Sequence, residues 1–92
     1  MSSRRSVSIR ILGKVQGVWY RASAKSEADS LHLTGFVSNM PDGSVYVEAS
    51  GLEDDVQKFI LWCQKGPQFA RVDEVHVEEI DTKSWNTFEI RR

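Results

Sequence analysis

Only one cysteine, Cys63, occurs in the 92 residues of this sequence. A single cysteine cannot form an intrachain disulfide, so an oxidising compartment is not required. The chain also contains no apolar run long enough for a transmembrane helix, and its basic N-terminus, MSSRRSV, lacks the apolar stretch of a signal peptide. We therefore expect a cytoplasmic protein without membrane contacts, in which residues 1–5 form a flexible tail.

An excess of charge of one sign is also missing. The 12 basic residues nearly balance the 13 acidic residues and give a net charge of −1. General attraction to nucleic acid or to an anionic membrane surface is therefore not expected. The hydrophobic fraction of 40% and the charged fraction of 27% are typical of a globular protein. Because the chain is short and has no internal repeats, we predict a single domain over residues 6–92 with one small core.

The first half of the chain alternates between strand and helix patterns. Apolar residues recur at every second position over residues 6–12, which is typical of a strand. Residues 22–33 contain no Gly or Pro and carry apolar residues at helical spacing, so they predict a helix that ends before Gly35. Residues 35–51 predict a hairpin, because the turn sequence MPDG separates two short strand-like segments.

The second half contains the clearest helix, over residues 53–65, with acidic residues at its start and a Lys-Gly-Pro sequence at its end. A strand within residues 72–80 and a short final strand over 87–92 complete the order βαββαβ plus one terminal strand. Two helices cannot cover both faces of such a sheet. We therefore predict an α+β fold, a ferredoxin-like two-layer sandwich with both helices on one face of a mixed, mostly antiparallel sheet.

The segment GKVQGVWYR, residues 13–21, connects the first predicted strand to the first predicted helix. Its glycines allow a tight turn in which several N–H groups and the positive end of the helix dipole converge, as in an anion-binding site. Arg21 would add a planar set of donors that matches a phosphate or a carboxylate. The segment lacks the nucleotide-binding patterns G-x-x-x-x-G-K-[ST] and G-x-G-x-x-G. Loop chemistry alone leaves two interpretations open, an anion site or a simple turn with a solvated arginine.

Asn39, beside the predicted hairpin turn, is a second candidate. In a split β-α-β fold the end of its strand can lie near the first loop. Its side-chain amide offers an acceptor and two donors, which could hold a water molecule in line with a phosphorus atom. An asparagine that only shapes the turn explains the local sequence more simply.

Together the two segments resemble the signatures of the acylphosphatase family. Residues 13–21 match the first signature, G-x-V-Q-G-V-x-F-R, with Tyr20 in place of the usual Phe. Residues 35–51 match the second, in which an asparagine lies between a glycine-aromatic pair and a glycine-valine pair. Two residues there depart from those common in the family: Ser38 and Met40. Residues 66–72, GPQFARV, resemble a later family segment, so the resemblance spans residues 6–91.

The resemblance implies an enzyme that hydrolyses the carboxyl–phosphate anhydride of acyl phosphates to a carboxylate and inorganic phosphate, without metal or cofactor. It places the catalytic residues of the family on Arg21 and Asn39. The backbone N–H groups of one loop would hold the phosphate: Val15, Gln16, Gly17, Val18, Trp19 and Tyr20. The implied partners are a small-molecule acyl phosphate and inorganic phosphate or a similar anion. We expect a monomer that binds no nucleic acid.

The other reactive residues have simpler explanations. Cys63 lies on the apolar stripe of the second predicted helix, which favours a core thiol. His32 and His76 have no further ligands at metal-binding spacing, so no metal site is predicted. Trp19 could line the mouth of the site and contact the acyl group, or it could only pack against the fold.

Two other functions are compatible with such a fold. One is a non-catalytic acylphosphatase-like module that binds carbamoyl or phosphate groups within a larger protein. The other is RNA binding on the sheet, for which Tyr46 alone would be a poor stacking platform. The presence of both Arg21 and Asn39 favours the enzyme over the module.

Overall fold

Five strands and two helices make up the computed structural model, which describes residues 3–81 and 85–91. Along the chain these elements are β1 (Arg4–Lys14), α1 (Tyr20–Ser30), β2 (Thr34–Asn39), β3 (Val45–Leu52), α2 (Glu53–Lys65), β4 (Arg71–Glu79) and β5 (Phe88–Arg91). The order is the predicted βαββαβ arrangement with a short terminal strand. Neither helix of the described chain is long and apolar enough to cross a membrane.

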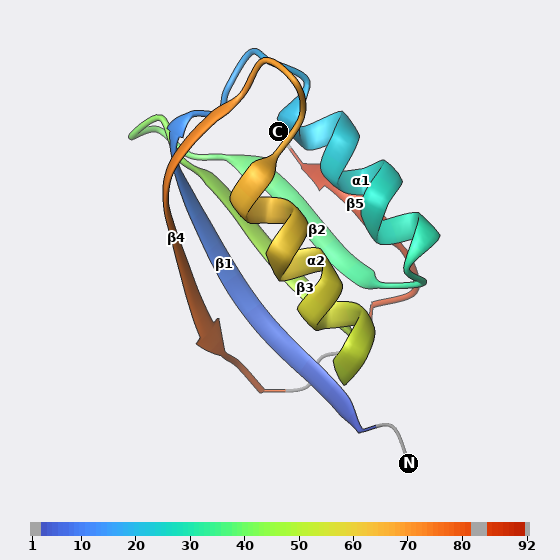
Figure 1. The fold of residues 1–92 in the computed structure, drawn as a ribbon. Helices are drawn as coiled ribbons and strands as arrows, with labels where there is room; N and C mark the ends of the chain where they lie inside the picture. The colour runs from blue at the N-terminus through green and yellow to red at the C-terminus, as the bar shows by residue number, and fades with distance from the viewer. Residues whose placement is uncertain (1–2, 82–84, 92) are drawn as a thin grey trace.

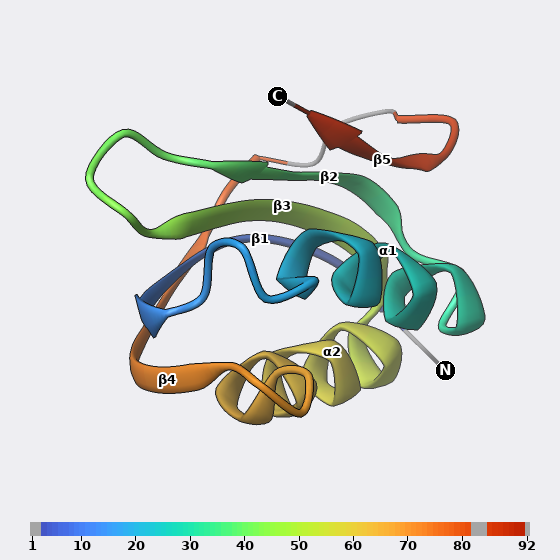
Figure 2. The same cartoon turned by 90° about the horizontal axis from the view of Figure 1, so that it is seen from above.

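The five strands form one mixed sheet in the order β4-β1-β3-β2-β5 (Figure 1). Neighbouring strands are antiparallel, except that β5 runs parallel to β2 at the edge of the sheet. Both helices lie on the same side of the sheet (Figure 2). The predicted α+β, ferredoxin-like sandwich is therefore confirmed. The other face of the sheet carries no helix in the described structure.

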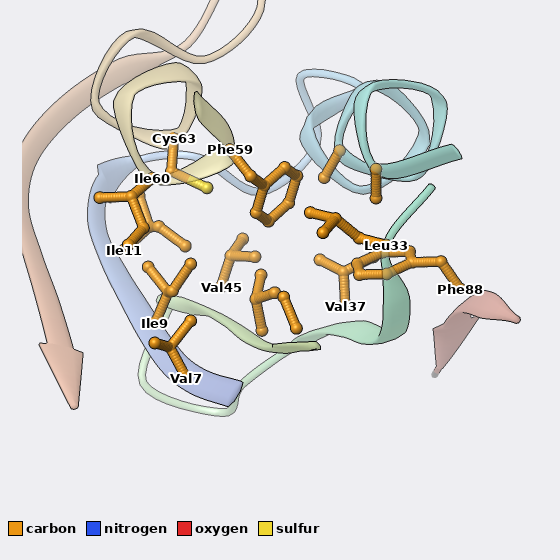
Figure 3. Close-up of a cluster of buried hydrophobic side chains, with 14 of the residues drawn as sticks. Val7, Ile9, Ile11, Leu33, Val37, Val45, Phe59, Ile60, Cys63 and Phe88 are labelled. Carbon is orange, nitrogen blue, oxygen red and sulfur yellow. The ribbon is translucent and has the colours of Figure 1, made fainter. Parts of the chain in front are cut away.

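The core lies between the helices and the sheet (Figure 3). Alternate residues of β1, namely Val7, Ile9 and Ile11, are fully buried there. They meet the stripe of α2 that carries Phe59 and Cys63, both also fully buried. Burial of a side chain as large as Ile or Phe contributes about 1.5–3 kcal/mol. Burial also raises the pKa of the Cys63 thiol to about 12, so this cysteine is a neutral core residue at ordinary pH, as the sequence predicts.

The first strand begins earlier than the sequence pattern indicates. Arg4 and Arg5, expected in a flexible tail, pair with Leu52 and Gly51 of β3. The carbonyl oxygen of Ser3 accepts a hydrogen bond of 2.7 Å from the N–H of Glu53, at the beginning of α2. Backbone groups make these contacts, so the pattern of apolar residues in the sequence does not predict them. Residues 1 and 2 lie outside the described residues.

The end of α1 also differs from the prediction. The helix ends at Ser30, because His32 adopts a left-handed conformation with φ of 58°. The N–H of Leu33 then donates to the carbonyl oxygen of Ala28 at 2.9 Å, and the N–H of His32 donates to that of Asp29 at 3.1 Å. This is the hydrogen-bond pattern of a Schellman C-cap, formed here without glycine. Gly35, the expected stop, lies in β2.

The final strand joins the sheet beside β2, a position that the sequence does not predict. Phe88 is buried, and its carbonyl oxygen accepts a hydrogen bond of 3.0 Å from Lys25 Nζ of α1. Gly35 to Ser38 of β2 pair in register with Phe88 to Arg91. The end of β5 is thereby fixed near the first turns of α1. Arg92, the last residue of the predicted strand, lies outside the described residues.

Gly13, at the end of β1, and Gly17, in the following loop, both have positive φ but differ in the space around them. Gly13 has φ of 133° at a bulge, and a Cβ there would lie 2.1 Å from the carbonyl oxygen of Arg71 in β4. Gly17 has φ of 73°, but a Cβ there would meet no atom within 4 Å. We expect Gly13→Ala to lower the free energy of unfolding by about 3 kcal/mol or more, and Gly17→Ala by only about 1 kcal/mol.

Urea denaturation of the two variants measures this difference. Equal losses of stability would contradict the close contact between Gly13 and β4.

Candidate active site

The loop between β1 and α1 presents its backbone in an unusual conformation. Gly17 and Trp19 have positive φ angles of 73° and 66°, whereas Val18 between them does not. Such alternation is typical of a nest, in which successive N–H groups turn toward one side and can bind an anion, and we refer to this loop as the nest. The loop leads into the N-terminus of α1, whose first turn contains no acidic residue. The partial positive charge of that helix end is therefore not neutralised by its own side chains.

Gln16 fastens this loop to the turn between β2 and β3. Its Nε2 donates hydrogen bonds to the carbonyl oxygens of Met40 and Ser44, both at 2.8 Å. These two carbonyls also belong to the turn itself, since Met40 N–H donates to the Ser44 oxygen and Gly43 N–H to the Met40 oxygen. The Gln16 side chain is thus a structural link, and only its backbone N–H is left for a ligand.

Asn39 is the last residue of β2 and directly precedes this turn. Its Oδ1 is buried and has no hydrogen-bond partner among the described residues. A buried acceptor without a partner costs about 1–3 kcal/mol, and such groups in folded proteins call for an explanation. Here the explanation lies in what the neighbouring residues form.

Arg21 lies in the first turn of α1 and is partly buried. Within the described chain its guanidinium makes no ion pair and no hydrogen bond. Four other arginines each face a carboxylate, in the pairs Arg5–Glu79, Arg10–Asp42, Arg71–Asp73 and Arg91–Glu89. Arg21 differs from these four because its donors remain available to an anionic ligand.

These groups share one cleft of about 480 Å³. Its lining residues are Val15, Gly17, Trp19, Tyr20, Arg21, Ala22, Asn39 and Ile90. The structure therefore brings Arg21 and Asn39, 18 positions apart in the sequence (39 − 21), to the same site. Two residues of the predicted loop do not line the cleft, because Gln16 is bound to the turn and Val18 packs against the core.

Tyr20 has a structural side chain. Its ring is buried against Trp62 at a centroid distance of 5.3 Å, and its hydroxyl donates a hydrogen bond of 2.7 Å to the carbonyl oxygen of Cys63. Burial raises the pKa of this hydroxyl far above its usual value. The hydroxyl that distinguishes Tyr20 from the usual Phe is thus satisfied inside the fold and does not serve a ligand.

Ile90 is a lining residue that the sequence did not indicate. It reaches the cleft because β5 pairs with β2, and no local signal predicts that pairing. Metal ligands do not gather here or elsewhere: within residues 3–81 and 85–91, no group of three His, Cys, Asp or Glu side chains could hold an ion. His32 and His76 are both exposed, and His76 Nε2 lies 3.3 Å from Glu74 Oε1.

Gln16→Ala tests the link between the loop and the turn. The variant loses two hydrogen bonds, but both carbonyl acceptors keep a backbone partner, so we expect the free energy of unfolding to fall by about 1–2 kcal/mol. Amide hydrogen exchange of the loop should accelerate more than that of the β1 core. Gln16→Glu should be less stable than Gln16→Ala at pH 7, because a carboxylate would face two carbonyl oxygens. Unchanged exchange in the loop would contradict this role.

Comparisons with known proteins find relatives of this chain. The family model described as Acylphosphatase matches residues 7–90. The acylphosphatase of Methylococcus capsulatus is 46% identical over 76 residues, which cover 83% of each chain. The solved structure of an acylphosphatase from Coxiella burnetii superposes with a TM-score of 0.93 at 35% identity, over 96% of this chain and 93% of that one.

A further similar structure is full-length HypF in its phosphate- and nucleotide-bound form, with a TM-score of 0.92 and 30% identity. That match covers all of this chain but 12% of HypF. The same fold therefore also occurs as a small part of a much larger protein. The extent of the family match and the identity to acylphosphatases of similar length establish that this chain belongs to the acylphosphatase family, whose members hydrolyse acyl phosphates.

Proposed function

We propose that this acylphosphatase holds the phosphoryl group of its substrate between the N–H groups of residues 15–20 and the guanidinium of Arg21, while Asn39 orients the attacking water. The observation that carries the proposal is that two side chains without protein partners line one cleft. An unpaired guanidinium lines it together with an asparagine whose buried Oδ1 has no partner among the described residues. Each group lacks what the reaction would bring, an anion for Arg21 and a hydrogen-bond donor for Asn39.

The reaction makes few chemical demands. Its leaving group is a carboxylate, which departs without prior protonation. The protein therefore needs to position the phosphoryl group, compensate the charge on its oxygens and aim the water. Backbone N–H groups of the nest and the donors of Arg21 suit the first two tasks, because the loop backbone is held within the fold and the guanidinium has no carboxylate partner among the described residues.

Asn39 suits the third task. Rotation about the terminal torsion of its amide, which is soft, would bring Oδ1 to a water molecule in the cleft. The water oxygen bonds to phosphorus as the bond from phosphorus to the carboxylate oxygen breaks. No described residue that lines the cleft is a His, Asp or Glu. We therefore assign the proton of the water to a phosphoryl oxygen, so that the products are a carboxylate and inorganic phosphate.

The alternative function is a non-catalytic module that binds its ligand within a larger protein, and such a module would use the same cleft. The two functions differ in turnover. Phosphate release from benzoyl phosphate in buffer containing EDTA would support the enzyme and its independence of metal. Phosphate binding without release would support the module. We also expect a cytoplasmic monomer, and size-exclusion chromatography tests the oligomeric state.

The uncovered face of the sheet carries more aromatic residues than Tyr46 alone. Phe36 lies beside it with ring centroids 6.0 Å apart, and Trp85 lies 6.1 Å from Phe36. Charged residues of both signs share this face, however. Arg91 lies over the Phe36 ring at 4.0 Å and pairs with Glu89. Glu78 lies opposite Ser8 in the strand register. These residues give a nucleic-acid backbone no excess of positive charge, so we retain the expectation that the protein binds no nucleic acid.

Arg21→Gln should lower kcat/KM for benzoyl phosphate by at least about 100-fold, since loss of one preorganised donor to a transition state costs about 2.7–4 kcal/mol. Arg21→Lys should recover only part of this loss, because an ammonium keeps the charge but not the planar pair of donors. Phosphate release measures both. Arg71→Gln, at an exposed arginine paired with Asp73 and outside the cleft, is the matched control. A folded Arg21→Gln protein with wild-type activity would refute the assignment.

Asn39→Ala should lower kcat more than it raises KM. It should lower the free energy of unfolding by less than about 1 kcal/mol, because the variant removes an acceptor that has no partner. Steady-state kinetics and urea denaturation on the same preparation separate these effects. Thr34→Ala, at the other end of β2 and outside the cleft, is the control. A large loss of stability with unchanged kcat would mean that Asn39 only shapes the turn.

A further inference from the structure

The part of the cleft that does not face the phosphoryl group is apolar. Apart from Arg21 and Asn39, the side chains that line it come from Val15, Trp19, Tyr20, Ala22 and Ile90. Trp19 and Ile90 are the large apolar residues among them that remain accessible, with 78% and 37% of their surface exposed. Val15 and Tyr20, by contrast, are buried in the core. The accessible walls of the cleft are therefore a tryptophan from one edge and an isoleucine from another.

Both the backbone conformation at Trp19 and its place at the start of a helix disfavour a tryptophan. Its φ of 66° lies in the left-handed region, which is strained for a bulky side chain and free of strain for glycine. It stands at the N-cap of α1, where Ser, Thr, Asp or Asn would be preferred, and it makes no capping hydrogen bond. No contact of its ring with another aromatic ring occurs in the described structure. Neither backbone geometry, capping nor burial accounts for a tryptophan here.

We propose that Trp19 and Ile90 form the acyl-binding surface of this enzyme and that it selects acyl phosphates with an apolar, planar acyl group. This inference rests on the function proposed above. With the phosphoryl group held at the nest and Arg21, the acyl group extends along the remaining walls of the cleft. A flat apolar group gains contact with the indole face of Trp19 and the side chain of Ile90.

Charge in the cleft supports the same substrate class. Arg21 is the only charged side chain that lines it among the described residues, and the phosphoryl group uses it. A second anionic group on the acyl part would find no cation there, and an ammonium group would find no carboxylate. Small acyl groups such as acetyl would leave most of the surface of Trp19 and Ile90 without a partner. Uncharged aromatic acyl groups are therefore the best match.

The test compares kcat/KM for benzoyl phosphate with kcat/KM for acetyl phosphate in the wild type and in variants. The wild type should favour benzoyl phosphate. Trp19→Ala should lower the ratio of the two values by about tenfold and Ile90→Ala by about threefold, as expected for apolar and aromatic contacts in a substrate pocket. Phe69→Ala is the matched control, because Phe69 is 70% exposed but does not line the cleft. It should leave the ratio unchanged.

Trp19→Gly separates the side chain from the backbone. Glycine accepts the left-handed conformation without strain, so this variant should be at least as stable to urea as Trp19→Ala. It should nevertheless lose the same preference for benzoyl phosphate. Competitive inhibition by phenylphosphonate and methylphosphonate gives a second readout, in which Trp19→Ala should weaken binding of the phenyl compound more than binding of the methyl compound.

The possible failures are distinguishable. A wild-type protein that hydrolyses neither substrate would overturn the proposed function and this inference with it. A wild-type protein that hydrolyses both, with a ratio that Trp19→Ala, Trp19→Gly and Ile90→Ala leave unchanged, would overturn the acyl-binding surface alone.

Discussion

The site depends on two hydrogen bonds from a single side chain. The Gln16 amide joins the loop after β1 to the turn after β2, and so connects segments that carry the nest on one side and Asn39 on the other. The two segments follow different strands, which both pair with Val45 of β3 near their ends, and the Gln16 hydrogen bonds extend this connection beyond the sheet to the loop itself. Both acceptors are carbonyl oxygens, so only a donor such as the Gln16 amide group can make this link.

The residues that hold the fold together and those that we propose to bind the ligand differ in their hydrogen bonds. Tyr20 and Gln16 use their polar side-chain atoms within the protein. Arg21 and Asn39 do not, within the described chain. Because folded proteins pair nearly all buried polar atoms, the unpaired Oδ1 of Asn39 beside a guanidinium without a carboxylate partner is informative about function. Trp19 is a third residue that does not favour stability, because its backbone is left-handed and its large apolar side chain is exposed.

Sequence patterns predict the parts of this fold that depend on local residues. The bounds of α2 agree with the prediction, since an acidic start, an apolar stripe and a Lys-Gly-Pro end all lie within the helix or beside it. The predicted end of α1 was wrong, because the left-handed residue that follows the helix is His32 and not a glycine. The pairing of β5 with β2 depends on backbone groups far apart in the sequence. Ile90 could therefore not be assigned to the cleft, whereas local chemistry made Arg21 and Asn39 candidates and the resemblance then favoured their functional interpretation.

The hydrogen bond from Tyr20 to the carbonyl oxygen of Cys63 has a consequence for motion. It joins the first turn of α1 to the C-terminal part of α2 inside the core, one residue before Arg21. The loop is therefore anchored in the core at its junction with α1, while Gln16 holds it to the turn after β2. Movement of the loop at the α1 end would require Tyr20 to leave its buried position against Trp62, so the position of Arg21 is coupled to the packing of the two helices.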